Sequence, residues 1–241
     1  MRIAFLFNYA LIDNRPWKQE LIAGLARDHE LFVIFGKNRV QDYVTGYLRR
    51  RSQIDVMERV RNTGEGRAAR RTVSTLRGLG VPFVTVASVN GEACRKHLGE
   101  FAPDYVVTAL DHRLSKATID SAPLFLNAHY GVLPHVKGWN ATEWSLLMRR
   151  ELTGSLHRVA PGIDSGEIYL TRPIEVRTGD TLEALRGKCQ AAALNMYRQF
   201  FADPGRYTSH PRCNSGGHTY YAMNRQLKAL VEGLVKAGRI S

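Results

Sequence analysis

Short apolar runs alternate with helical segments through the first half of this sequence, and this alternation restricts the fold more than any other feature. Strands that alternate with helices build βαβ units, which assemble into a parallel sheet covered by helices. The sequence therefore predicts an α/β protein with an open, mostly parallel, twisted sheet. The predicted strands are Arg2–Phe7, Leu31–Phe35, Pro82–Val86, Tyr105–Leu110 and Leu124–Asn127.

Helical patterns occupy the segments between these strands. Trp17–Arg27 carries its apolar residues at helical spacing, and Gly91–Glu100 also suits a helix. Residues 38–80 are rich in arginine, so we expect exposed helix there.

The second half of the chain changes character, with two predicted strands around a glycine-rich loop and then mainly helix. Asp180 is a candidate N-cap for the long helix that follows it. We therefore expect a core over residues 1–178 and a small, mainly helical C-terminal extension over residues 179–241. The predicted elements are a helix at Ala141–Arg150, strands at Thr153–Val159 and Glu167–Val176, helices at Thr181–Phe201 and Leu227–Val235, and a loop at 205–218.

Several classes of protein are disfavoured by composition and motif. No apolar run approaches the roughly 20 residues of a membrane helix, and Ile3–Phe7 is too short for a signal peptide, so we expect a cytoplasmic protein. The cysteines are scattered and form no CxxC pair, and no metal site is expected. The turn after the first strand, Asn8–Trp17, has no glycine, so neither a GxGxxG nor a P-loop phosphate site is indicated.

The most informative stretch is Leu126–Gly138, LNAHYGVLPHVKG. Asn127 and His129 stand two residues apart at the end of an apolar strand, so extended backbone places both side chains on one side. Open α/β sheets bind ligands at the carboxyl ends of their strands. Asp164 follows later, between two glycines in the loop GIDSG.

Amide, imidazole and carboxylate suit acyl transfer from one nitrogen to another. Asn127 and a protonated His129 could stabilise the oxyanion of a tetrahedral intermediate. Asp164 beside the imidazole would raise the pKa of His129 and so assist a proton relay. The spacing by itself also allows the simpler reading, in which His129 is a structural residue at a strand end.

The motif order resembles that of the folate-dependent formyltransferase family. The pattern is Asn127-x-His129, then Leu133-Pro134 and Gly138, and then Gly162-Ile163-Asp164-Ser165-Gly166. The similarity covers about Val106 to Val176. This chain departs from the family pattern by having Tyr130-Gly131 for proline and serine, and Ala160-Pro161 for Asp-Glu.

The resemblance implies a formyltransferase core, an N-formyltransferase reaction with 10-formyltetrahydrofolate as co-substrate, and Asn127, His129 and Asp164 as catalytic residues. His157 matches a position near the family's site, where it would orient other groups or only fill the strand. The residues expected around the folate are Ala109, Leu110, Asp111, His112, Arg113, Leu114, Gly162 and Ile163.

The amine acceptor is expected from the same resemblance. The family's phosphate loop for glycinamide ribonucleotide is missing, and the region after Val176 reads mostly as helix where a tRNA-specific relative has a barrel. We therefore expect a nucleotide-diphosphate amino sugar, and the resemblance allows a homodimer. Residues that could contribute to the acceptor site are Trp139, Asn140, Trp144, Tyr220 and Tyr221.

Other functions stay open at this point. The net charge of +12 favours an anionic partner, which a folate, a nucleotide diphosphate, a nucleic acid or an acidic membrane would satisfy. The alternatives are a formyltransferase for another small amine or methionyl-tRNA, a formyltetrahydrofolate hydrolase, and a non-catalytic relative that binds nucleic acid.

Overall fold

The computed structural model describes residues 1–8, 16–37, 65–110 and 112–240. These residues form two compact units, one that ends at Asn127 and one that begins at Ala128. The predicted division at residues 178 and 179 stays a prediction. The predicted polar turn after the first strand, and the first part of the arginine-rich segment, lie outside the described residues.

The first unit is built on a parallel sheet with the strand order β3-β2-β1-β4-β5. Helices cover such sheets on both faces, which is why the strands read as continuous apolar runs in the sequence. In β1 every residue from Ile3 to Asn8 is buried. All five predicted strands are confirmed, at β1 Arg2–Asn8, β2 Glu30–Gly36, β3 Phe83–Val86, β4 Tyr105–Ala109 and β5 Phe125–His129.

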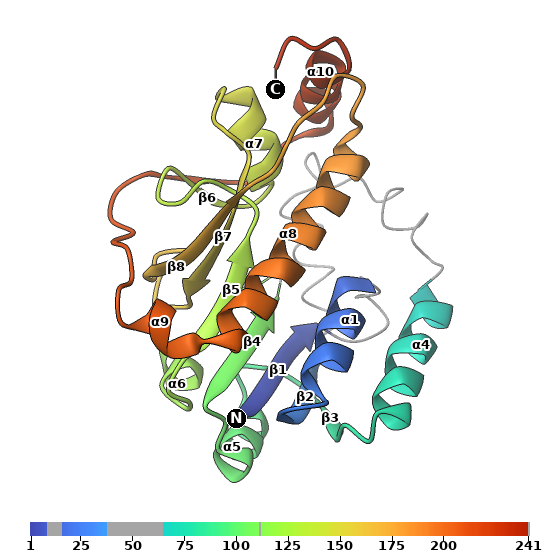
Figure 1. The fold of residues 1–241 in the computed structure, drawn as a ribbon, viewed down its shortest axis with the longest axis vertical. Coiled ribbons are helices and arrows are strands. Elements are labelled where there is room, and N and C mark those ends of the chain that lie inside the picture. The colour runs from blue at the N-terminus through green and yellow to red at the C-terminus, as the bar shows by residue number, and fades with distance from the viewer. Residues whose placement is uncertain (9–15, 38–64, 111, 241) are drawn as a thin grey trace. The chain divides into compact units, whose positions relative to one another are not determined.

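The longer helices of the first unit bury apolar residues. Helix α1 buries Trp17, Leu21, Ile22 and Leu25, as the helical spacing predicts. It lies beside α4, where the Gln19 side chain donates a hydrogen bond to Thr72 Oγ1 over 2.9 Å (Figure 1). The helices are α1 Pro16–Leu25, α4 Glu65–Gly78, α5 Glu92–Phe101 and α6 Lys116–Ile119.

The second unit contains an antiparallel hairpin of β7 Thr153–Arg158 and β8 Ile168–Pro173. The register of the hairpin shifts between Leu156 and His157. Helix α8, Leu182–Ala202, packs against both strands (Figure 1). Gly154 permits this close packing, because a Cβ there would lie 3.0 Å from the Met196 methyl group.

The start of α8 differs from the sequence-based expectation. Thr181 is the N-cap, and its hydroxyl accepts a hydrogen bond from the Ala184 N–H over 3.0 Å. The prediction of Asp180 as N-cap is wrong, because the Asp180 carboxylate accepts from the Arg177 N–H and pairs with Lys188 at 2.6 Å. A carboxylate held by Arg177 in the preceding turn and by Lys188 in the helix itself is not free to cap the helix.

Two short parallel strands complete the second unit, β6 Val136–Gly138 and β9 His218–Tyr220. The sequence-based reading missed both, and it also placed α9, Pro204–Thr208, largely inside a predicted loop. Elements of three to five residues are too short to show a hydrophobic period. The predicted helices at the two ends of this unit are confirmed as α7 Ala141–Leu147 and α10 Arg225–Lys236.

A hydrophobic cluster joins α7, α8 and α10 within the second unit. Leu146, Leu185 and Val231 are nearly or fully buried in it. The unit therefore has its own apolar core beside its polar site. None of the described helices has the length and apolar character needed to cross a membrane.

Candidate active site

Strand β5 carries the two residues of the predicted Asn-x-His motif. The strand continues to His129, so the extended geometry that the motif requires is present. Residues i and i+2 of a strand point to the same face, which gives Asn127 and His129 a common side. Asn127 is partly buried, whereas His129 is only 7% exposed.

Both ring nitrogens of His129 face hydrogen-bonding groups in the second unit. Nε2 lies 2.8 Å from the carbonyl oxygen of Val136, and Nδ1 lies 3.3 Å from Asp164 Oδ2. A carbonyl oxygen can only accept, so Nε2 carries a proton whenever this bond is made. A second ring proton would therefore reside at Nδ1, next to the carboxylate.

The loop that holds Asp164 has little freedom. Asp164 itself adopts a left-handed backbone conformation with φ of 45°, which aspartate tolerates better than most residues. A Cβ at Gly166 would lie 2.1 Å from the carbonyl oxygen of Arg158. Asp164 Oδ2 accepts a hydrogen bond from the Gly138 N–H over 2.8 Å. A glycine at position 166 is thus a steric requirement of the loop.

His157 brings a second imidazole to the same carboxylate. Its Nε2 lies 3.5 Å from Asp164 Oδ1, and its Nδ1 lies 2.7 Å from the carbonyl oxygen of Arg158. The ring is 2% exposed and stands at 85° to the ring of His129. Each imidazole is therefore anchored through one nitrogen on a backbone carbonyl and presents the other to Asp164. The contact favours an orienting role for His157 over that of strand filler.

The shifts in the pKa values of His129 and Asp164 indicate which of the two groups is charged at rest. Burial lowers the pKa of His129, and this effect exceeds the opposing influence of the Asp164 carboxylate. Burial alone would raise the pKa of Asp164, but His129, His157 and the Gly138 N–H together hold it well below its usual range. The prediction that Asp164 raises the pKa of His129 is confirmed, but burial of the ring outweighs this effect, so the pKa is lowered overall. The resting pair is a carboxylate beside a neutral imidazole.

The residues predicted to contact the folate fall in both units. Ala109 ends β4, and the exposed His112 and Arg113 follow it, whereas Asp111 lies outside the described residues. The Asn90 side chain holds this loop by donating to the Arg113 carbonyl and accepting from the Ser115 N–H. Leu110 and Leu114 belong to the same loop, and Gly162 and Ile163 precede Asp164 in the second unit. A folate site formed by these residues remains a prediction.

The aromatic residues named as acceptor candidates gather beside β6 and β9. Trp144 and Tyr220 stack with ring centroids 5.0 Å apart, and Trp144 Nε1 donates to the Tyr221 carbonyl. Trp144 and Tyr220 cover each other. Trp139 and Tyr221 are more exposed, with exposed fractions of 38% and 76%. Asn140 accepts a hydrogen bond from the Met223 N–H, so it braces this region.

Sequence reasoning missed a polar residue that contacts the loop of Asp164. Asn214 is 7% exposed, and its side chain donates to the carbonyl oxygens of Asp164 and Gly166. It stands alone in a segment that reads as loop, so no periodicity or motif marks it. Over the ranges that the structure describes, no group of three histidine, cysteine or acidic residues has the arrangement of a metal site.

The sequence matches the formyl transferase family over residues 34–200, and the chain belongs to that family. This family uses 10-formyltetrahydrofolate as its formyl donor. The resemblance seen in the motifs is thereby confirmed, and so is the predicted α/β fold with a mostly parallel sheet and a helical C-terminal region.

Particular relatives differ in the acceptor that their names state. A methionyl-tRNA formyltransferase of Anaeromyxobacter sp. (strain K) is 31% identical over 136 residues, which are 54% of this chain and 44% of that protein. This chain thus spans less than half the length of that relative.

Solved structures of sugar-modifying enzymes share the fold. A sugar N-formyltransferase from Shewanella sp. has a TM-score of 0.61 and 16% identity, covering 98% of this chain and 87% of its own. A formyltransferase from Anoxybacillus kamchatkensis, solved with UDP-4,6-dideoxy-4-formamido-L-AltNAc and tetrahydrofolate, has a TM-score of 0.52 and 14% identity, covering 92% and 86%.

Proposed function

We propose that this protein transfers the formyl group of 10-formyltetrahydrofolate to the amine of a nucleotide-linked amino sugar. The observation that carries the reaction is the Asp164 carboxylate between the imidazoles of His129 and His157, in a member of the formyl transferase family. The folate, when bound, supplies the activated formyl group.

The residues present suit such a donor. Negative charge develops on the formyl oxygen as an amine adds to the formyl carbon, and fixed hydrogen-bond donors stabilise it. Both nitrogens of His129 already face Val136 and Asp164, so we assign the donor role at the oxyanion to the carboxamide of Asn127.

His129 and Asp164 serve the proton transfer. The attacking amine must lose a proton, and the leaving nitrogen must gain one. Nδ1 of His129 carries no proton in the resting state and faces an ionised carboxylate. A proton that the attacking amine releases to this pair is therefore held as an imidazolium–carboxylate ion pair, and the pair returns it to the leaving nitrogen. Asp164 thus stabilises the imidazolium, and His157 keeps the carboxylate oriented.

Two observations support a nucleotide-linked acceptor. The exposed rings of Trp139 and Tyr221 lie close to β6, whose Gly138 N–H binds Asp164, and an aromatic face suits a nucleotide base. The excess of arginine and lysine suits a diphosphate. The shared fold with sugar N-formyltransferases, one of them solved with a UDP-sugar, is consistent with this assignment.

Methionyl-tRNA is the second candidate acceptor. The relatives with 31% identity are methionyl-tRNA formyltransferases, and a net charge of +12 would also favour tRNA. Salt separates the two, because tRNA binding would weaken much more steeply with ionic strength than binding of one diphosphate.

The test is an acceptor panel with 10-formyltetrahydrofolate. It should include UDP- and dTDP-linked amino sugars, methionyl-tRNA, glycinamide ribonucleotide and hydroxyornithine. We expect tetrahydrofolate and formylated sugar in equal amounts. Turnover of methionyl-tRNA or a small amine, with none of the sugars, would refute the acceptor but leave formyl transfer intact. Release of formate at the same rate without any amine would instead identify a hydrolase.

A further inference from the structure

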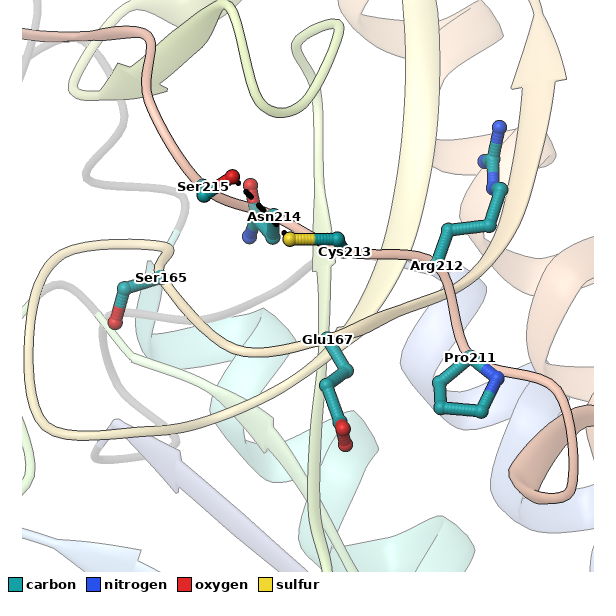
Figure 2. A pocket seen from close by; sticks show the side chains of 7 residues that line it. All are labelled: Ser165, Glu167, Pro211, Arg212, Cys213, Asn214 and Ser215. Carbon is teal, nitrogen blue, oxygen red and sulfur yellow. Dashed lines mark hydrogen bonds between the residues drawn. The ribbon is translucent and has the colours of Figure 1, made fainter.

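The segment Pro211–Ser215 runs alongside the loop that carries Asp164. Figure 2 shows these residues beside Ser165 and Glu167, around a common pocket. The backbones are joined directly, since Arg212 and Ile168 exchange two N–H to carbonyl hydrogen bonds of 2.8 and 3.0 Å. The next residues, Cys213 and Asn214, therefore occupy a defined position relative to the loop.

Asn214 is the one residue of this segment whose side chain turns into the protein. Its Nδ2 donates to the carbonyl oxygens of Asp164 and Gly166 over 2.8 and 2.6 Å. Its Oδ1 meets no hydrogen-bond partner in the part of the chain that the structure describes. Because both partners are carbonyl oxygens, the carboxamide acts here purely as a double donor.

The loop needs such a clamp because its conformation is demanding. Asp164 has φ of 45°, and its carboxylate must reach His129, His157 and the Gly138 N–H together. Asn214 holds the backbone on both sides of this turn. Without it, the carbonyl of Asp164 would be free to rotate and the carboxylate would move with it.

Lys137 ties the same segment to the other side of the site. Its Nζ donates to the carbonyl oxygen of Asn214 over 3.1 Å, and the side chain is buried. Lys137 stands in β6 between Val136, which accepts from His129, and Gly138, which donates to Asp164. The segment then continues into β9, which pairs with β6. Residues 211–220 therefore hold Asp164 directly, through Asn214, and hold His129 through β6.

We infer that Asn214 is a positioning residue that holds the Asp164 carboxylate against His129, an inference that rests on the proposed function. Asn214 lies beyond residues 34–200, over which the chain matches its family. The effect of Asn214 passes through Asp164, so it should appear in the chemical step and in the titration of His129. The charged groups that face His129 are Asp164, His157 and Lys137.

The test compares Asn214→Ala with Asn224→Ala. Asn224 is a matched control because its side chain accepts from the Leu227 N–H at the start of α10, and among the described residues it makes no hydrogen bond to His129, His157 or Asp164. We expect Asn214→Ala to lower kcat about 10- to 100-fold while KM changes less than about threefold. NMR of labelled histidine should show His129 titrating at lower pH, because a loosened carboxylate no longer favours the charged ring. Asn224→Ala should lose thermal stability but keep the kcat and the titration of the wild type.

The Asn214→Asp variant tests whether the side chain acts by donating hydrogen bonds or only by its shape. It keeps the outline of the side chain but faces the two carbonyl oxygens with acceptors, so we expect a loss of kcat at least as large as in Asn214→Ala. Wild-type kcat in Asn214→Asp, or wild-type kcat and titration in Asn214→Ala, would overturn the inference. If the wild type formylated no amine, the proposed function would be refuted. The titration of His129 would still decide whether Asn214 positions the Asp164 carboxylate.

Discussion

The two units differ in the polar groups that they bury. Among the described residues of the first unit, the buried polar side chains are three threonines together with Asn8 and Lys18. The second unit buries His129, Lys137, Glu143 and His157, and Asp164 lies only partly exposed among them. Burying ionisable groups is unfavourable unless each is paired. The contrast indicates that the paired imidazole and carboxylate groups belong to the second unit, whereas the first unit contributes Asn127 at its end.

The partners of these groups support the same contrast. Thr108 in the first unit donates to the Leu126 carbonyl, a local contact within the sheet. Glu143 in the second unit pairs with Arg186 from another helix at 2.7 Å. Such a charge has its partner only when the second unit is folded, because the two residues lie far apart in the sequence. Changes at these groups should therefore alter chemistry, whereas changes in the apolar core of the first unit, away from Asn127, should alter stability.

The largest effect should follow the same substitution made in each unit. Asp164→Asn should lower kcat about 10²- to 10⁴-fold, because it removes the charge that stabilises the protonated His129. Asp104→Asn in the first unit, where the carboxylate accepts from the Arg2 N–H, should leave kcat unchanged. Steady-state kinetics of both variants provides the measurement. An Asp164→Asn enzyme with more than a tenth of wild-type kcat would refute the proposed role.

A core change in the first unit should affect folding without affecting chemistry. Phe5 is fully buried in β1, so Phe5→Ala should lower the free energy of unfolding by about 3–5 kcal/mol. Urea denaturation measures this loss. The kcat per folded molecule should remain that of the wild type, and a specific fall in kcat would show that the core around Phe5 also affects the chemical step.

Acidification should destabilise the protein through the second unit. The pKa of His129 is lower in the folded protein than the roughly 6.5 of an unfolded chain, so protonation favours unfolding. Stability is then fully present above about pH 6.5 and declines as the pH falls towards the folded pKa. Asp164, also lowered, should add a further loss below about pH 4.

Melting temperatures measured between about pH 8 and pH 4.5 test this effect. His129→Gln should flatten the decline that begins near pH 6.5, while His210→Gln, which removes an exposed imidazole, should preserve it. Equal slopes in His129→Gln and the wild type would mean that another group causes the decline.

The smallest effect concerns the start of α8. Thr181→Ala should cost about 1 kcal/mol of stability, because the hydroxyl that caps the Ala184 N–H is lost. Thr181→Ser retains the hydroxyl and should behave as the wild type. Unchanged stability in Thr181→Ala would contradict the capping role of Thr181 and favour Asp180 as the N-cap.

The sequence was sufficient to predict the sheet where burial is continuous. Strands β1, β2 and β4 lie in the interior, so their apolar runs mark them directly. Strand β5 was predicted to end at Asn127 but extends to His129, because polar residues replace the apolar pattern at its end. Motif order located Asp164, whose place in a loop carries no periodic signal.

Other features of the site depend on burial and distant contacts. The sequence shows a carboxylate and an imidazole, but only the structure shows that burial outweighs the carboxylate at His129. Asn214 reaches Asp164 across 50 residues of chain, from a segment with no motif. Such a contact follows from the paths of β6 and β9, which are too short to predict.

The most direct test of the account follows a labelled formyl group in the wild type and in His129→Ala. Both proteins receive 10-formyltetrahydrofolate with a ¹³C-labelled formyl carbon and a nucleotide-linked amino sugar, and NMR records the labelled amide. The account predicts a sugar formamide signal that grows with tetrahydrofolate in the wild type and is nearly absent with His129→Ala. Equal transfer by both proteins, or no labelled amide on any amine with the wild type, would contradict it.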